Sequence, residues 1–183
     1  MNAKAIIGVV TLALALVNTT TAQALNMSGN VKPRHWAWAK QAQQRGVPLP
    51  SASVKVYPGD FDPMYDPAKR IMYIPDENRK QEHILFLHEL GHVFDYHNLN
   101  QLERKKFKIL INSRCAWWSP ACKLWRYGYR ESNLEPGEIF AEMYAACAIG
   151  LTREQIEDRD YVSYGYIPDP AIEPKICQAI KSY

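Results

Sequence analysis

The sequence predicts an α+β domain in which a small twisted sheet is followed by several helices. Two β-prone runs, residues 53–57 and 70–74, lie between turn residues, whereas the segment after residue 77 repeats its apolar residues with helical spacing. At 183 residues the chain is long enough to bury one hydrophobic core without help from a metal or a disulfide. A bound metal would therefore serve chemistry rather than folding.

The two strands have different patterns. Val54 and Val56 alternate with Lys55 in the first, which is typical of a half-buried strand, and the second is the β-prone run RIMYI. Turn residues around Gly59, Asp62-Pro63 and Asp66-Pro67 separate them. We expect the second strand to form the sheet edge next to the helix that follows.

The helices have recognisable ends. Asn78 and Gln81 can form a capping box for the long helix that follows the strands, Pro136 can begin a later helix, and Gly150 can end it as a C-cap. The long helix is apolar on nearly all sides and should be buried. We expect helices over 33–44, 77–97, 101–112, 136–149, 152–158 and 174–181, and a loop over 113–134.

The first 24 residues have the pattern of a cleavable signal peptide, which would leave residues 25–183 as one domain. Lys4 precedes an apolar run that is too short to span a bilayer, and Ala22-Gln23-Ala24 supplies a small-x-small cleavage triplet. The alternative is an uncleaved anchor or a buried first helix. We expect a secreted or periplasmic protein with no stable membrane association after signal cleavage.

Charge and cysteine content narrow the class further. The chain has 22 basic and 19 acidic side chains, a near-balance that predicts no nucleic-acid partner, and we expect a monomer. An even number of cysteines in an exported chain predicts disulfides. Of the three possible pairings we favour Cys115–Cys122 and Cys147–Cys177, because the first pair is close in sequence and brackets a turn.

The segment HELGH has the spacing of a metal site. His88 and His92 are four residues apart, so on a helix both rings project from one face and can reach one ion at about 2.0–2.1 Å. Glu89 lies beside them, where its carboxylate can take a proton from a zinc-bound water. Two satisfied core histidines are the alternative, but three titratable groups within an apolar helix are costly unless something pairs them.

A catalytic zinc needs a third protein ligand, since its fourth position stays open for water. His97 points away from His92 on a continuing helix. Asp95 shares their face, but its short side chain would more easily accept a hydrogen bond from a ligand histidine than reach the metal. On the later helix, Glu138 and Glu142 lie on one face, so that one can be a ligand and the other its supporting partner, and Gly91 and nearby alanines would let the two helices approach closely.

The segments HELGHVFDY and GEIFAEMYA resemble the gluzincin branch of zinc metallopeptidases, and most closely the catalytic domain of anthrax lethal factor and its relatives, over residues 53–150. The resemblance implies a zincin-like fold, in which a small sheet packs on the HExxH helix, followed by a second ligand-bearing helix and a further C-terminal helix. It also implies a single zinc ion held by His88, His92 and Glu138, with Glu89 as catalytic base and Glu142 as supporting carboxylate.

That family also places a tyrosine upstream of the ligand glutamate, where its hydroxyl stabilises the oxyanion. In RYGYRESNLEPGE, Tyr127 has the Tyr-Gly match and Tyr129 has the better distance to Glu138, and we favour Tyr129. The predicted function is a secreted zinc-dependent endopeptidase acting on a peptide or protein substrate. Two alternatives are a catalytically inactive zincin-fold binding module and a zinc amidase acting on cell-wall peptides.

Overall fold

The computed structural model describes residues 24–60, 62–76, 79–119, 124–126, 129–132, 135–157 and 166–183. The elements of this part of the chain are β1 (Asn26–Gly29), α1 (Pro33–Gln44), β2 (Ser53–Gly59), β3 (Met64–Asp66), β4 (Ile71–Pro75), α2 (Arg79–Asn98), α3 (Gln101–Leu110), β5 (Leu124–Arg126), β6 (Tyr129–Ser132), α4 (Pro136–Ile149), α5 (Arg153–Glu157) and α6 (Glu173–Ser182). Nearly all of the predicted signal peptide lies outside the described residues. The described residues include no helix with both the length and the apolar character that a membrane span requires.

Four strands form a mixed sheet in the order β1-β2-β4-β3. β1, β2 and β4 are parallel neighbours, and β3 runs antiparallel to β4. The predicted strands correspond to β2 and β4, and the α+β class is confirmed. One sheet face is fully buried because alternate residues of these two strands enter the core, namely Val54, Val56, Met72 and Ile74.

The edges of the sheet differ from the prediction. The sequence pattern does not predict β1 or β3, because each is too short to show a clear alternation and β3 lies between two Asp-Pro turns. β4 lies between β2 and β3, so the prediction that residues 70–74 form the edge is wrong. The edge strand that contacts α2 is β3.

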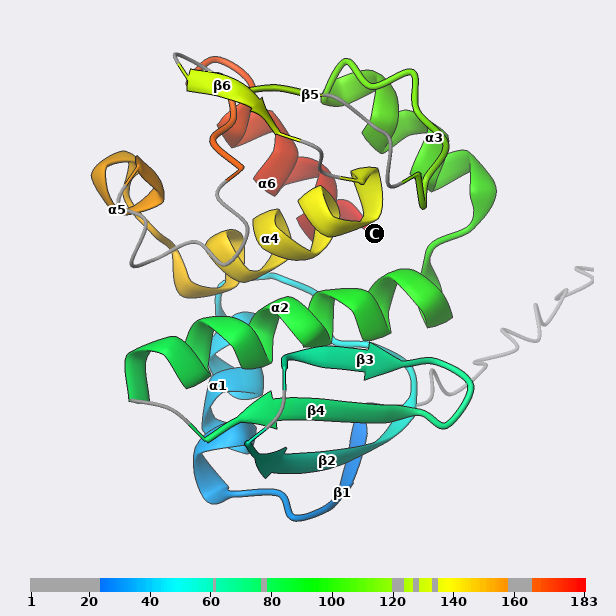
Figure 1. Cartoon of the computed structure of the whole chain (residues 1–183), viewed down its shortest axis with the longest axis vertical. Coiled ribbons are helices and arrows are strands. Elements are labelled where there is room, and N and C mark those ends of the chain that lie inside the picture. The colour runs from blue at the N-terminus through cyan, green and yellow to red at the C-terminus, as the bar shows by residue number, and fades with distance from the viewer. Residues whose placement is uncertain are drawn as a thin grey trace, which may run out of the picture.

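Helix α2 crosses the middle of the molecule (Figure 1). The sheet and α1 lie on one side of it, and α4, α6 and α3 lie on the other. Its most extensive contact is with α4. A Cβ atom added to Gly91 would lie 2.9 Å from the Ala141 Cα, so a larger residue would force the two helices apart. The predicted close approach of these helices is confirmed.

The N-terminal part of α2 is held by a buried carboxylate. Glu82 is fully buried, and its carboxylate accepts hydrogen bonds from the Arg34 Nε at 3.0 Å and from the His35 Nε2 at 3.1 Å. The His35 ring also stacks on Phe86. Because both of these hydrogen-bond donors come from α1, the contacts fix α2 against α1 one to two turns before His88.

The end of α4 is fixed in two ways. The predicted disulfide between Cys147 and Cys177 joins α4 to α6, with Cα atoms 5.5 Å apart, and a loop of this length contributes roughly 3–4 kcal/mol in the chain-entropy account. Gly150 has φ 73°, which confirms the predicted C-cap. Cys115 is also disulfide-bonded, and its predicted partner Cys122 lies outside the described residues.

The described parts of the segment between α3 and α4 include two paired strands. Strands β5 and β6 pair antiparallel within residues 113–134, so the prediction of a loop is wrong there. The period of two is hard to see in such short strands because LWR and YRES each offer three or four residues. The predicted helix boundaries are correct to within two residues for α1, α2, α3, α4, α5 and α6.

Candidate metal centre

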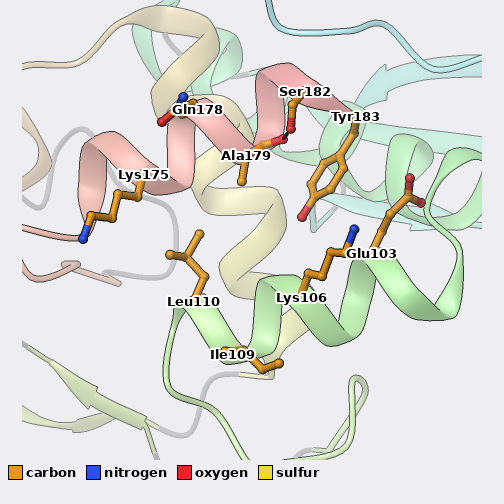
Figure 2. A pocket seen from close by; sticks show the side chains of 9 residues that line it. All are labelled: Glu103, Lys106, Ile109, Leu110, Lys175, Gln178, Ala179, Ser182 and Tyr183. Atoms are coloured by element: carbon orange, nitrogen blue, oxygen red, sulfur yellow. Dashed lines mark hydrogen bonds between the residues drawn. The ribbon is translucent and has the colours of Figure 1, made fainter.

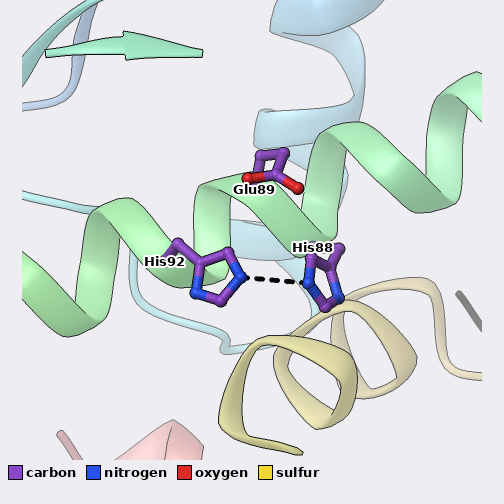
Figure 3. A group of neighbouring side chains, drawn as sticks. All are labelled: His88, Glu89 and His92. Atoms are coloured by element: carbon purple, nitrogen blue, oxygen red, sulfur yellow. Dashed lines mark hydrogen bonds between the residues drawn. The ribbon is translucent and has the colours of Figure 1, made fainter. Parts of the chain in front are cut away.

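Three side chains from two helices converge at the contact between α2 and α4. The His88 Nε2 lies 3.1 Å from the His92 Nε2, and the Glu138 Oε2 lies 3.3 Å from each of these nitrogens. Figure 3 shows the two rings on the side of α2 that faces α4, with Glu89 leaving the helix on another side. The structure thus brings together the three residues predicted as ligands.

The spacing of these three atoms fits a tetrahedral ion. Ligand atoms at about 2.0–2.1 Å from a central zinc lie about 3.3–3.4 Å from one another, because that is the edge of the tetrahedron they define. The three edges found here are 3.1, 3.3 and 3.3 Å. Two imidazoles and one carboxylate also form a donor set that zinc accepts. The residues therefore fit a metal ion that leaves one position open.

Glu89 belongs to the same cluster but is not the third ligand that this geometry favours. Its carboxylate, His88 and His92 offer ligand atoms within 4.8 Å of one another, so the three could hold a metal. The Glu138 Oε2 lies 3.3 Å from the Nε2 atom of each histidine, which is the separation expected of two ligands of one zinc ion. Glu138 is therefore a candidate for the third ligand, with Glu89 beside it.

Glu142 contacts the His88 ring at Nδ1, the nitrogen that does not face the other donor atoms. Its Oε2 lies 3.2 Å from the His88 Nδ1, one turn along α4 from Glu138. This contact assigns the proton of His88 to Nδ1 and leaves the Nε2 lone pair facing the other donors. The predicted supporting role of Glu142 agrees with this position.

The cluster favours positive charge. Burial alone would lower the pKa of His88, but hydrogen bonds to Glu138 and Glu142 and the charge of Glu89 raise it to about 10. Burial would raise the pKa of Glu138, yet its hydrogen bonds to the two histidines hold it well below the ordinary value. Burial raises the pKa of Glu89. Three carboxylates around two imidazoles thus favour a proton or a metal cation at their centre.

Two buried polar atoms of the cluster have no hydrogen-bond partner among the described residues, the Glu89 Oε2 and the His92 Nδ1. Glu89 is 1% exposed, and an unsatisfied buried acceptor of this kind costs about 1–3 kcal/mol. The backbone N–H of Tyr65 in β3 donates a hydrogen bond to the Glu89 carboxylate. Glu89 therefore keeps one acceptor oxygen for a group that enters the site.

Asp95 has different partners from those predicted. Its Oδ1 accepts from the Arg104 Nε at 2.8 Å and its Oδ2 from the Trp117 Nε1 at 2.8 Å. In the described part of the chain no hydrogen bond joins Asp95 to a ligand histidine. The side chain is short, and Arg104 on α3 and Trp117 each donate to one of its two oxygens. Asp95 instead anchors the segment that leads from α3 toward α4.

The predicted oxyanion tyrosines are not located by their side chains. Tyr127 lies outside the described residues, and Tyr129 begins β6. The structure places two other tyrosines at the site, Tyr65 and Tyr96. Tyr96 is four residues after His92 on α2, so its helical spacing could have been recognised, whereas Tyr65 lies in a segment where only turns are predicted. His97 is 2.6 Å from the Tyr65 hydroxyl and takes no part in the cluster.

The cluster opens into a pocket of about 260 Å³, whose lining includes Glu89, His92 and Glu138. A larger groove of about 600 Å³ lies between α3 and α6, lined by Glu103, Lys106, Ile109, Leu110, Lys175, Gln178, Ala179, Ser182 and Tyr183 (Figure 2). Its described lining has no histidine or cysteine and a single side-chain carboxylate, that of Glu103. The chemistry of the molecule therefore points to the smaller pocket.

Comparisons with protein-family models, with curated proteins and with solved structures find no match. The fold and the site by themselves define an α+β protein with a mixed four-stranded sheet and a buried group, His88, Glu89 and His92, that could hold a metal ion.

Proposed function

We propose that this protein is an exported zinc-dependent endopeptidase with a zincin-like fold, as its resemblance to the gluzincins implies. The observation that carries the proposal is the convergence of the His88, His92 and Glu138 donor atoms at 3.1–3.3 Å. The HExxH helix between a small sheet and a second ligand-bearing helix is consistent with that fold. The unsatisfied oxygen of Glu89 favours an enzyme over an inactive binding module.

The residues of the cluster would have distinct roles in peptide hydrolysis. When bound, zinc would supply a Lewis acid that lowers the pKa of a water molecule and polarises the scissile carbonyl. Glu89 accepts a proton from the attacking water as the new C–O bond forms, and it passes that proton to the amine as the C–N bond breaks. Glu142 holds the ring of His88 in the orientation that its ligand role requires.

The substrate would lie along β3 rather than β4. β3 is one of the two outer strands of the described sheet, and the backbone N–H of Tyr65 donates to the Glu89 carboxylate, so the outer edge of β3 faces the cluster. An extended peptide can pair with such an edge by strand addition, which would bring one of its carbonyls near the pocket. Tyr129 or Tyr127 would then stabilise the oxyanion, as the resemblance implies.

The test compares the oxidised parent chain with Glu89→Gln, Glu138→Ala and a control, Glu154→Gln, which alters an exposed carboxylate on α5. Bound zinc is measured by mass spectrometry, and cleavage is assayed on a peptide library that includes cell-wall peptides. We expect one zinc per chain in the parent, the control and Glu89→Gln, cleavage by the parent and the control alone, and loss of zinc in Glu138→Ala.

Other outcomes would overturn the proposal in distinct ways. Equal cleavage by the parent and Glu89→Gln would exclude the proposed base, and absence of zinc from all forms would exclude the metal. Zinc binding by a parent that cleaves nothing would favour the binding module. Cleavage restricted to cell-wall peptides would favour the amidase.

A further inference from the structure

The pocket at the metal centre has a polar floor and an apolar rim. Its lining includes Glu89, His92 and Glu138, which we call the floor, and Met64, Tyr96 and Trp118, which we call the rim because Met64 and Tyr96 are exposed whereas Glu89 and His92 are buried. At about 260 Å³ the space is just below the range of sites that take drug-sized ligands, so it suits one large side chain.

The rim carries exposed apolar side chains. Among the described residues, five large apolar side chains are prominently exposed, and two of them, Met64 at 50% and Tyr96 at 42%, line this one pocket. The Trp118 ring stacks on Tyr96 with centroids 5.4 Å apart and also lies 5.7 Å from the His92 ring. Grouped apolar exposure of this kind marks binding surfaces, whereas single exposed residues do not.

The Trp118 side of the rim is held in place. Its neighbour Trp117 donates to the buried carboxylate of Asp95, and the Trp117 carbonyl accepts from the Gly137 N–H at 3.2 Å. A Cβ at Gly137 would lie within 2.4 Å of the Trp118 ring, so the indole sits directly on the first turn of α4. The wall is therefore positioned against the helix that carries Glu138, and binding to it needs little ordering.

We propose that Met64, Tyr96 and Trp118 form a subsite for one large apolar or aromatic side chain of the substrate, next to the bond that is cut. This inference rests on the proposed peptidase function. Candidate ligands His92 and Glu138 line the pocket, and β3, an outer strand among the described residues, begins at Met64, so a peptide paired with β3 would direct a side chain onto this wall. Such a side chain would contact the stacked rings of Tyr96 and Trp118, and its apolar surface would be removed from water.

The first experiment compares kcat/KM for peptide pairs, chosen from the library, that differ by phenylalanine or alanine at one position beside the cleaved bond. We expect the parent to prefer phenylalanine by tenfold or more at one such position. Met64→Gln and Tyr96→Ala should each reduce that preference severalfold with one zinc still bound, and Trp118→Ala should reduce it most. Ile109→Gln, which alters an equally apolar exposed residue in the groove of Figure 2, should leave it unchanged.

A second measurement is independent of zinc and of cleavage. Binding of N-acetyl-phenylalaninamide and N-acetyl-alaninamide to the metal-free chain is followed through the indole N–H signals in NMR spectra, with Trp118→Phe used to assign the signal. We expect the aromatic amide alone to shift the Trp118 signal, and Met64→Gln to weaken that binding.

The two results separate this inference from the function on which it rests. Cleavage without preference for a large apolar residue near the bond, or with a preference that Met64→Gln and Tyr96→Ala both leave intact, would overturn the subsite and leave the peptidase standing. Absence of zinc and cleavage, with retained Trp118-dependent binding of the aromatic amide, would overturn the peptidase and keep an aromatic-binding pocket.

Discussion

The Nδ1 atom of His88 lies 3.2 Å from the Glu142 Oε2, and both residues are almost fully buried. This contact links the two motifs of the sequence, because one residue belongs to HELGH on α2 and the other to GEIFAEMYA on α4. Its consequence is that the orientation of a candidate ligand on one helix depends on a carboxylate of the other.

Removing that carboxylate should weaken metal binding without abolishing it. We expect Glu142→Ala to lower zinc affinity about 10- to 100-fold, the range typical of such supporting partners, because the His88 ring loses the acceptor that fixes its orientation. Glu142→Gln keeps an acceptor and should lose less. Titration with a zinc chelator measures both, and an affinity equal to that of the parent in Glu142→Ala would contradict the supporting role.

The close contact of α2 and α4 can be tested at Gly91. Alanine normally stabilises a helix by about 1 kcal/mol relative to glycine, but here its Cβ would lie 2.9 Å from the Ala141 Cα and 3.2 Å from the Ala141 carbonyl oxygen. Backbone atoms cannot move aside as a flexible side chain does, and overpacking costs about 1–3 kcal/mol. We therefore expect Gly91→Ala to lower both the free energy of unfolding and the affinity for zinc, measured by urea denaturation and by chelator titration. A more stable variant would contradict this packing.

Much of the site could be predicted from sequence because its geometry is local. His88 and His92 are four residues apart on one helix, so their convergence follows from helical spacing alone. Glu138 could be predicted as a candidate ligand because it also lies on a clear helix. The contact of this helix, α4, with α2 follows from the small residues that both helices carry. Each of these steps uses the period of 3.6, which long helices display plainly.

The rest depends on contacts between distant segments. Strand β3 has three residues between turns, and it becomes a strand because β4 offers it a partner. Asp95 faces the histidines in a helical projection, but Arg104 and Trp117 compete for its oxygens, and no spacing rule reveals them. The rim residue Trp118 likewise reaches the site through a long connection whose path the sequence pattern does not determine.

The position of Asp95 separates its role from that of Glu138. Asp95→Asn keeps the shape of the side chain but removes a charge that accepts from Arg104 and Trp117. Hydrogen bonds to a buried charged group contribute about 1.5–3 kcal/mol each. We therefore expect Asp95→Asn to lower the free energy of unfolding, measured in urea, by roughly that amount. Zinc affinity should change by less than tenfold because, in the described part of the chain, the hydrogen bonds of Asp95 go to Arg104 and Trp117 and not to a ligand histidine. Asp62→Asn, at an exposed aspartate, should change neither quantity, and complete loss of zinc in Asp95→Asn would place Asp95 in the metal centre.

The stability of the fold should depend on pH through His83. This ring stacks on Trp38 with centroids 4.7 Å apart, its Nε2 has no partner among the described residues, and burial lowers its pKa to about 4. The unfolded chain takes up the proton near pH 6.5, before the folded chain does, so the free energy of unfolding should fall as pH drops from about 6.5 to about 4. With allowance for the partial exposure of the ring, this fall should be about 1–2 kcal/mol. His83→Phe keeps an aromatic ring on Trp38 and removes the titration. Between pH 7 and pH 4.5, the free energy of unfolding measured in urea should therefore fall less in this variant than in the parent. An equal fall in both proteins would assign the pH dependence to other groups.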